Sequence, residues 1–315
     1  MNQRRYRKSN YRRQRTKTII VISVISAIVL FTIFLIWGLS LAEKTKDYEI
    51  EGDEFEERES DSEVTRTVNT VNAYPLPLLE DGSSFSTRLA NVKAGANSVC
   101  VSLNKPNGTL LYRSSIASSF PYLSVESDAS SLSNYVKAIN DENMYITATL
   151  FIPTFEETED DLKADIELSI WGSVVCEAIR GGIGDVLLIA DKATEEDVEK
   201  LSALAERIHI TEESAVVGLC LPNSVLEAEK SVSLIDKLSK SFDYLAFNAT
   251  SINVKEGGTL IESTEEAIAN MQLQLMYYKM RVLLPRGASA EELDKLAEIV
   301  TKHSISSWQA LPLNT

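Results

Sequence analysis

From residue 71 onward, short runs of β-branched and apolar residues alternate with longer segments whose apolar residues recur at helical spacing. Runs of this length indicate buried strands, and the longer segments indicate amphipathic helices. The eight expected strands are residues 71–79, 98–103, 145–152, 185–189, 215–221, 244–247, 280–284 and 306–311. The seven expected helices are residues 85–94, 132–139, 160–180, 194–208, 225–239, 264–278 and 290–302.

Several of these helices have a capping box, in which an N-cap hydroxyl and an acid three residues later satisfy each other's backbone donors. The pairs are Thr158 with Asp161, Thr194 with Asp197, Ser263 with Glu266, and Ser289 with Glu292. Strands that alternate with helices indicate βαβ units and a parallel sheet. Eight units in about 245 residues match the (β/α)8 barrel, which typically has about 250. We therefore expect a TIM-like α/β barrel over residues 71–315, in preference to a doubly wound open sheet.

Residues 18–42 carry no charge and are mostly Ile, Val, Leu and Phe. A helix over this run would be about 37 Å long, which is enough to cross a hydrocarbon core of about 30 Å. Trp37 would then lie near the far interface, where indole rings are common. The run therefore predicts one transmembrane helix and makes the lipid bilayer a partner of the chain.

The charges on either side of this run predict its orientation. Residues 1–17 contain eight bases and no acid, whereas residues 43–63 contain eleven acids and three bases. This asymmetry places a basic tail in the cytoplasm and everything after residue 42 outside the cell membrane. Ser40-Leu-Ala42 resembles a signal-peptide cleavage site, but the apolar run exceeds the usual h-region of about 7–15 residues. We therefore expect an uncleaved signal-anchor, followed by an acidic, extended stalk over residues 43–70.

The composition limits the function further. The net charge of −15 argues against nucleic acid as a partner, because phosphate binding requires clustered Lys and Arg. Apolar residues make up 44% of the chain, which is enough for a packed core. There is no HExxH motif, Cys/His cluster or Gly-rich phosphate loop, so we expect neither a metal nor a cofactor.

In a barrel of this type, binding and catalytic residues lie where the strands end and the βα loops begin. The acids at these positions that could be catalytic are Glu80, Glu156 and Asp191. The side chains expected to bind a ligand are Asn104, Lys105, Lys192, Asn248, Arg286 and Trp308. Trp171 with Tyr277 and Tyr278 could also form a platform for a sugar, although aromatic residues within helices are more often part of a core.

Two segments resemble a family of glycoside-hydrolase-like barrel domains. The first is residues 88–114, which end in Gly108-Thr-Leu-Leu-Tyr112-Arg-Ser114 and are similar to the family's Gly-x-Leu-x-Tyr-x-Ser motif after strand two. The second is residues 176–189, from Cys176-Glu177-Ala through Gly182-Ile-Gly-Asp185 into strand four. Residues 145–152 are similar to the family's third strand. The resemblance covers about half of the expected barrel and implies a carbohydrate-active domain.

The departures from this family concern its polar strand-end residues. Ser102, Asn104 and Lys105 stand in a turn that the family fills with Asp and Lys, and Thr149 stands where an Arg is expected. Ile189 takes the place of the strand-end Asp, and Asp191 follows two residues later. The resemblance therefore implies a barrel whose catalytic acids have been lost.

Three functions remain open. Glycoside hydrolysis needs two carboxyl groups about 5–9.5 Å apart, and Asp191 with Glu80 or Glu156 is the pair that an active enzyme would use. We favour a non-catalytic barrel that binds cell-envelope glycan or a partner protein. An assembly scaffold, with its strand-end face covered by another protein, is the third possibility.

The cysteines and histidines suggest no further chemistry. Cys100, Cys176 and Cys220 are expected to be buried free thiols, with a Cys100–Cys220 disulfide as the alternative in an oxidising compartment. His209 and His303 lie in or just after expected helices and have no partner at metal-ligand spacing.

Overall fold

A computed structural model describes residues 66–78, 82–92, 96–120, 123–152, 161–222, 231–249, 259–275, 280–284 and 290–312. The expected transmembrane run over residues 18–42 and most of the expected stalk lie outside these residues. Among the described residues, no helix combines the length and the apolar character needed to cross a membrane.

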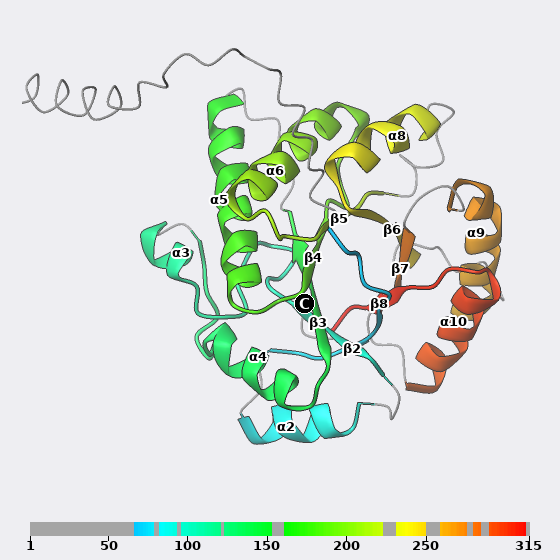
Figure 1. Cartoon of the computed structure of the whole chain (residues 1–315), viewed down its shortest axis with the longest axis horizontal. Coiled ribbons are helices and arrows are strands. Elements are labelled where there is room, and N and C mark those ends of the chain that lie inside the picture. Colours follow the sequence, from blue (N-terminus) through cyan, green and yellow to red (C-terminus); the bar gives the residue numbers. More distant parts are fainter. Residues whose placement is uncertain are drawn as a thin grey trace, which may run out of the picture. The chain divides into compact units, whose positions relative to one another are not determined.

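Eight parallel strands pair in sequence order and close into a barrel, as the sequence predicts (Figure 1). Pairing of Ala73 with Gln309 joins the first strand to the last. Every expected strand is present, and most are shorter than expected. The strands are β1 (Asn72–Pro75), β2 (Ser98–Ser102), β3 (Tyr145–Phe151), β4 (Asp185–Ile189), β5 (Val217–Cys220), β6 (Tyr244–Asn248), β7 (Met280–Leu284) and β8 (Trp308–Ala310).

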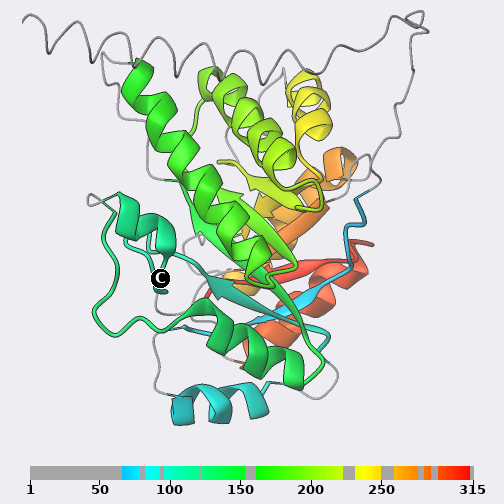
Figure 2. The ribbon, with the colours of Figure 1, turned by 60° about the vertical axis from the view of Figure 1, so that its left-hand side comes forward.

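Helices surround the barrel, and α5, α6 and α8 lie side by side along it (Figures 1 and 2). The short α3 was not expected. The helices are α2 (Gly82–Ala90), α3 (Ser115–Ser119), α4 (Leu132–Asp141), α5 (Asp161–Arg180), the 3-10 helix η1 (Glu195–Asp197), α6 (Val198–Thr211), α8 (Ser231–Ser241), α9 (Leu260–Leu275) and α10 (Ala290–Lys302).

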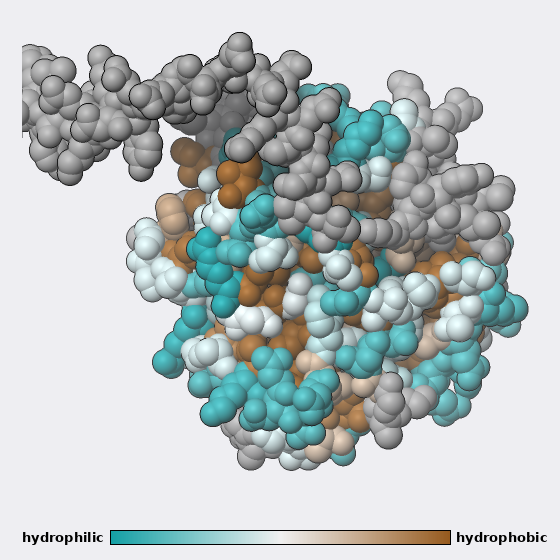
Figure 3. All heavy atoms as spheres, in the orientation of Figure 1, coloured by the Kyte–Doolittle hydropathy of each residue, from teal (hydrophilic) through white to brown (hydrophobic). Residues whose placement is uncertain are grey.

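The longer helices bury one face and leave the other to solvent, whereas α3 and η1 bury no residue. In α4, for example, Leu132, Tyr135, Val136 and Ile139 are buried at the spacing of successive helical turns. Hydrophilic side chains accordingly cover much of the outer surface near α2 and α4, at the bottom of Figure 3.

Two hydrophobic cores result from this arrangement. The outer core lies between the strands and the helices, and the inner core lies within the barrel. The inner core joins side chains from six neighbouring strands and their ends: Phe151, Leu187, Ile189, Val216, Cys220, Tyr244, Ala246, Leu283 and Leu311. The barrel is therefore filled with side chains and is not a channel.

Two of the four capping boxes can be compared with the structure. The Thr194 backbone N donates to Asp197 Oδ2 over 2.8 Å at the start of η1, which confirms this box. The Ser263 box is wrong, because α9 begins before Ser263 and is capped by Thr259, whose hydroxyl accepts from Glu262 N over 3.2 Å. The other two N-cap residues, Thr158 and Ser289, lie outside the described residues.

Residues 66–71, which include the last residues of the expected stalk, contact the amino-terminal end of the barrel. Arg66 donates to the Glu213 carbonyl over 3.1 Å, and Val68 packs against the inner core. Asn69 O accepts from Arg281 Nη2 over 3.2 Å, and Val71 O accepts from Trp308 N over 2.9 Å. Contacts with the barrel are therefore already present at Arg66, the first residue that the structure describes.

Candidate functional site

The carboxyl ends of the strands form the barrel mouth, where barrels of this type place their chemistry. Phe151, Ile189 and Cys220 are the last residues of β3, β4 and β5, and all three belong to the inner core together with Leu283 and Leu311. These strand ends therefore place apolar side chains inside the barrel at the positions from which a hydrolase would direct its polar groups.

Asp191 and Lys192 follow β4 at the rim of this mouth, and both are exposed. The Asp191 side chain makes no hydrogen bond or ion pair with the described residues. Burial raises the pKa of the Cys220 thiol, and the negative charge of Asp191 adds to this effect. Asp191 is available at the mouth, but within the described chain no second carboxylate is paired with it.

Asn104, expected to bind a ligand, is fully buried and serves as part of the sheet. Its Nδ2 donates to the Phe151 carbonyl, and its Oδ1 accepts from Phe151 N, each over 2.8 Å. These two bonds continue the β2–β3 ladder past the end of β2, so both polar atoms of the amide are used within the protein.

Apart from Lys192, the other described ligand candidates are also engaged within the protein. Lys105 forms an ion pair with Glu126, and Asn248 is 3% exposed. Trp308 is buried in the outer core with its ring edge-to-face against Tyr74, at a centroid distance of 5.2 Å. A sugar could not stack on Trp308 without displacing this packing. Glu80, Glu156 and Arg286 lie outside the described residues.

A tight hairpin follows β2. Gly108 N donates to Lys105 O over 2.9 Å, and Lys105 N donates to Thr109 O over 2.9 Å. Pro106 has the fixed φ that the first central position of a type I turn favours, and Gly108 has a φ of 87°, in the left-handed region. A type I turn followed by a left-handed glycine is a common three-residue hairpin loop, so the local sequence specifies this shape.

The chain beyond this hairpin is held against α5 by one carboxylate. Glu177 Oε2 accepts from the hydroxyls of Tyr112 over 2.9 Å and Ser114 over 2.5 Å, and Glu177 Oε1 accepts from Ser115 N over 2.7 Å. Burial alone would raise the pKa of Glu177, but these hydrogen bonds outweigh it and lower the pKa. Glu177 thus stays ionised and joins the loop to the helix.

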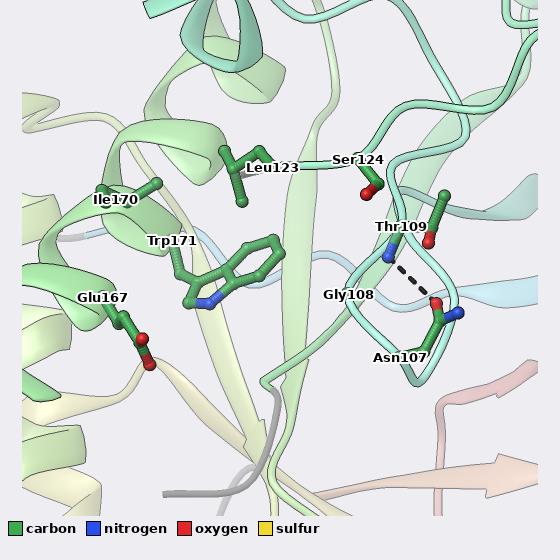
Figure 4. Close-up of a pocket in the computed structure, with 8 residues that line it drawn as sticks. All are labelled: Asn107, Gly108, Thr109, Leu123, Ser124, Glu167, Ile170 and Trp171. Atoms are coloured by element: carbon green, nitrogen blue, oxygen red, sulfur yellow. Dashed lines mark hydrogen bonds between the residues drawn. The ribbon is translucent and has the colours of Figure 1, made fainter. Parts of the chain in front are cut away.

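A pocket of about 200 Å³ lies between the hairpin and the first half of α5 (Figure 4). The Trp171 indole extends from α5 toward the turn at Asn107, and Leu123 lies over it (Figure 4). The eight lining residues are Asn107, Gly108, Thr109, Leu123, Ser124, Glu167, Ile170 and Trp171. Trp171, which the sequence suggested could contact a sugar, therefore lines a pocket at the side of the barrel. Tyr277 and Tyr278 lie outside the described residues.

A buried ion pair at the opposite, amino-terminal end of the barrel was not expected from the sequence. Arg281 donates to both Asp185 oxygens, over 2.8 and 2.9 Å, and both residues are almost completely buried. The Tyr244 hydroxyl donates to Asp185 over 3.0 Å, while its ring lies under the Arg281 guanidinium at 3.9 Å. Burial would lower the pKa of Arg281, but Tyr244 and Asp185 outweigh it and raise the pKa. This network lies inside the barrel, away from the mouth.

The three cysteines are buried free thiols, as expected. Burial is the main cause of the raised thiol pKa values of Cys100 and Cys220, so neither is a ready nucleophile. In the described part of the chain, no group of three or more His, Cys, Asp or Glu side chains could hold a metal ion.

No protein-family model matches the sequence, and no curated protein matches it. Among solved structures, the fold is similar to that of a "putative alpha-L-fucosidase" from Bacteroides thetaiotaomicron, with a TM-score of 0.52 and 11% identity over 79% of this chain and 89% of that chain. A GH18 chitinase from Pseudoalteromonas aurantia gives a TM-score of 0.48 and 8% identity over 76% and 92% of the two chains. At such low identity the likeness to the Bacteroides protein shows the fold alone, and the described residues between 66 and 312 form an eight-stranded parallel α/β barrel.

Proposed function

We propose that this chain is a glycoside-hydrolase-like barrel that binds carbohydrate at the cell envelope without hydrolysing it. The observation that carries the proposal is the apolar character of three neighbouring strand ends, Phe151, Ile189 and Cys220, which lie within the inner core. Glycosidases hold two carboxyl groups about 5–9.5 Å apart on either side of the scissile bond. These three inward positions supply none.

The two segments that resemble glycoside-hydrolase-like domains support a link to carbohydrate. Tyr112 and Ser114, from the first segment, meet Glu177, from the second, in the hydrogen bonds that join the loop to α5. The resembling residues therefore maintain the framework of the barrel, whereas the position of the family's strand-end acid holds the apolar Ile189. This combination favours a barrel that has retained its architecture and lost hydrolysis.

The proposal includes a membrane anchor. The uncharged run over residues 18–42, preceded by bases and followed by acids, would keep the amino terminus in the cytoplasm and the barrel outside. The acidic segment over residues 43–63 would act as a spacer. At this location the partners available to the barrel are cell-wall polysaccharide and other envelope proteins.

The proposal can be tested with the full chain purified in detergent. Co-sedimentation with insoluble cell-wall polysaccharide measures binding, and release of reducing sugar from the same material measures hydrolysis. We expect binding without turnover. Turnover that is abolished in the Asp191→Asn variant would overturn the non-catalytic assignment in favour of a hydrolase. A complete lack of glycan binding would overturn the carbohydrate assignment in favour of a scaffold.

A further inference from the structure

We propose that residues 66–71 form a strap across the amino-terminal end of the barrel, and that this strap opens locally, without unfolding of the barrel, once Arg66 is released. The strap belongs to the fold, so it does not depend on carbohydrate binding. The path of the strap, the polar groups beneath it and the small number of contacts that hold it in place all favour such an opening.

The strap crosses the barrel from one side to the other. At its start, Arg66 contacts Glu213 and Asp243, which lie in the loops before β5 and β6. At its end, Val71 O accepts from Trp308 N of β8, and β1 follows directly. In a closed ring of eight strands β5 lies opposite β1, so these six residues span the amino-terminal end (Figure 1).

Buried polar groups lie beneath the strap. Asn69 O accepts from Arg281 Nη2 over 3.2 Å, and Arg281 is paired with Asp185. Gln309 Oε1 accepts from Arg281 Nη1 over 3.3 Å, but Gln309 Nε2 and Arg281 Nε are buried without a hydrogen-bond partner in the described chain. Burial removes the hydration of charges, and an unpaired buried donor costs free energy. Water entering beneath an open strap would hydrate the ion pair and satisfy both donors, so these groups favour opening.

Few contacts oppose this opening. Arg66 Nη1 lies 3.5 Å from Asp243 Oδ1, and Arg66 Nε donates to the Glu213 carbonyl over 3.1 Å. Val68 packs against the inner core but is only half-buried. The remaining side chains between Arg66 and Val71 are exposed. A segment with so little buried surface opens at a lower free energy than the strands and helices of the core.

Cys100 can report the opening, because its side chain lies inside the barrel at the level of the buried ion pair. Its two neighbours on β2 belong to the outer core, so the Cys100 side chain faces the interior. Cys100 pairs in register with Thr147, whose hydroxyl donates to Asp185 over 2.5 Å. The Cys100 thiol is fully buried and free, so a reagent can reach it only when the surrounding structure opens.

The test labels the folded full chain in detergent with a small methanethiosulfonate reagent, and peptide mass spectrometry measures the labelling of Cys100. In the unchanged chain, Cys100 should react faster than global unfolding allows, and its rate should depend only weakly on urea. Arg66→Gln should increase this rate by about 3- to 10-fold, because it removes the bonds at the start of the strap. Val68→Ala should increase it by about threefold, because it reduces the apolar contact with the inner core.

Arg180→Gln is the matched control for Arg66→Gln. Arg180 also combines an ion pair, with Glu212, and a hydrogen bond to a backbone carbonyl, that of Thr211, but it lies outside the strap. Its replacement should leave the labelling of Cys100 unchanged. Arg66 is at the surface, so its variant should fold as the unchanged chain does.

Glu177→Gln distinguishes local opening from global unfolding. It weakens the junction between α5 and the loop after β2, which the open strap leaves intact, so the labelling of Cys100 should not change. If Glu177→Gln or Arg180→Gln accelerates the labelling as strongly as Arg66→Gln, or if Arg66→Gln has no effect, the proposal is overturned. It is also overturned if the labelling of Cys100 has the same urea dependence as global unfolding.

Discussion

The hydroxyl of Tyr112 donates a 2.9 Å hydrogen bond to Glu177, which lies 65 residues further along the chain. These two residues come from the two segments that resemble glycoside-hydrolase-like domains. Their contact shows that the similarity between such distant segments reflects a structural junction, at which a loop after β2 is fixed to α5. A glutamate in a motif of this kind is therefore not by itself a sign of catalysis.

Replacing Glu177 by Gln should destabilise the barrel by about 2–3 kcal/mol, because an amide cannot accept from all the donors that the carboxylate now satisfies. Equilibrium urea unfolding gives the change in free energy. Glu199→Gln is the matched control: Glu199 forms an ion pair with Lys237 but is 81% exposed, and solvent screens such pairs so that they contribute little to stability. Equal losses in the two variants would show that the Glu177 junction has no special stabilising role.

Glu177 also predicts a pH dependence of stability. Its folded-state pKa is lower than the ordinary value of 4.5, so the unfolded chain binds a proton more readily than the folded chain does. The ionised Glu177 side chain therefore contributes fully to the free energy of unfolding above pH 4.5. This contribution is lost as the pH falls through the lower, folded-state pKa. Urea unfolding at a series of pH values should show that the difference between the unchanged chain and Glu177→Gln narrows in acid. A difference that does not change with pH would contradict this assignment.

Variants of the buried pair Asp185 and Arg281 can show whether leaving one buried charge unpaired costs more stability than removing both charges. Arg281→Met should destabilise the protein by about 3–5 kcal/mol, because it leaves Asp185 without its cation in the barrel interior. The double variant, with Asp185→Leu added, removes both charges and should be more stable than Arg281→Met alone. Urea unfolding of the two variants tests this order. If the double variant is less stable than Arg281→Met, the unpaired charge of Asp185 is not the cause of the destabilisation.

Two glycines provide a matched test of packing around the barrel. A Cβ at Gly218 would lie 2.2 Å from the Tyr244 ring, whereas one at Gly172 would lie 3.0 Å from the end of the Leu204 side chain. The buried ring cannot move away, so Gly218→Ala should cost at least about 2 kcal/mol. Gly172→Ala should change stability by less than about 1 kcal/mol, because a flexible methyl can shift and alanine favours the helix. Thermal unfolding measures the stability of both variants. Similar losses of stability in Gly218→Ala and Gly172→Ala would contradict this account of the packing.

The sequence predicts the barrel well because apolar periodicity is a local property of the chain. All eight strands follow from runs of apolar residues, and the resulting pattern determines which residues enter the inner core. The functional positions are harder to predict, because they depend on which distant side chains meet. Asn104 follows a strand, as a ligand-binding residue would, yet its amide completes the sheet with Phe151. The Trp171 pocket depends on α5 meeting a hairpin far from it in sequence, and no local pattern shows that meeting.

The start of α9 shows the same limit at the scale of a single residue, and it gives the last prediction. Both Thr259 and Ser263 are followed three residues later by a glutamate, so the pattern alone fits either as the N-cap. In the structure Thr259 Oγ1 accepts from Glu262 N, and Thr259 N donates to Glu262 over 3.0 Å. Thr259→Val keeps the shape of the side chain and loses the acceptor, so it should cost about 1 kcal/mol. Ser263 lies inside the helix, so Ser263→Ala should change the free energy of unfolding by at most a few tenths of a kcal/mol, because alanine has a high helix propensity. Thermal unfolding of the two variants measures both changes, and a larger loss at Ser263 would restore the start of the helix that the sequence predicts.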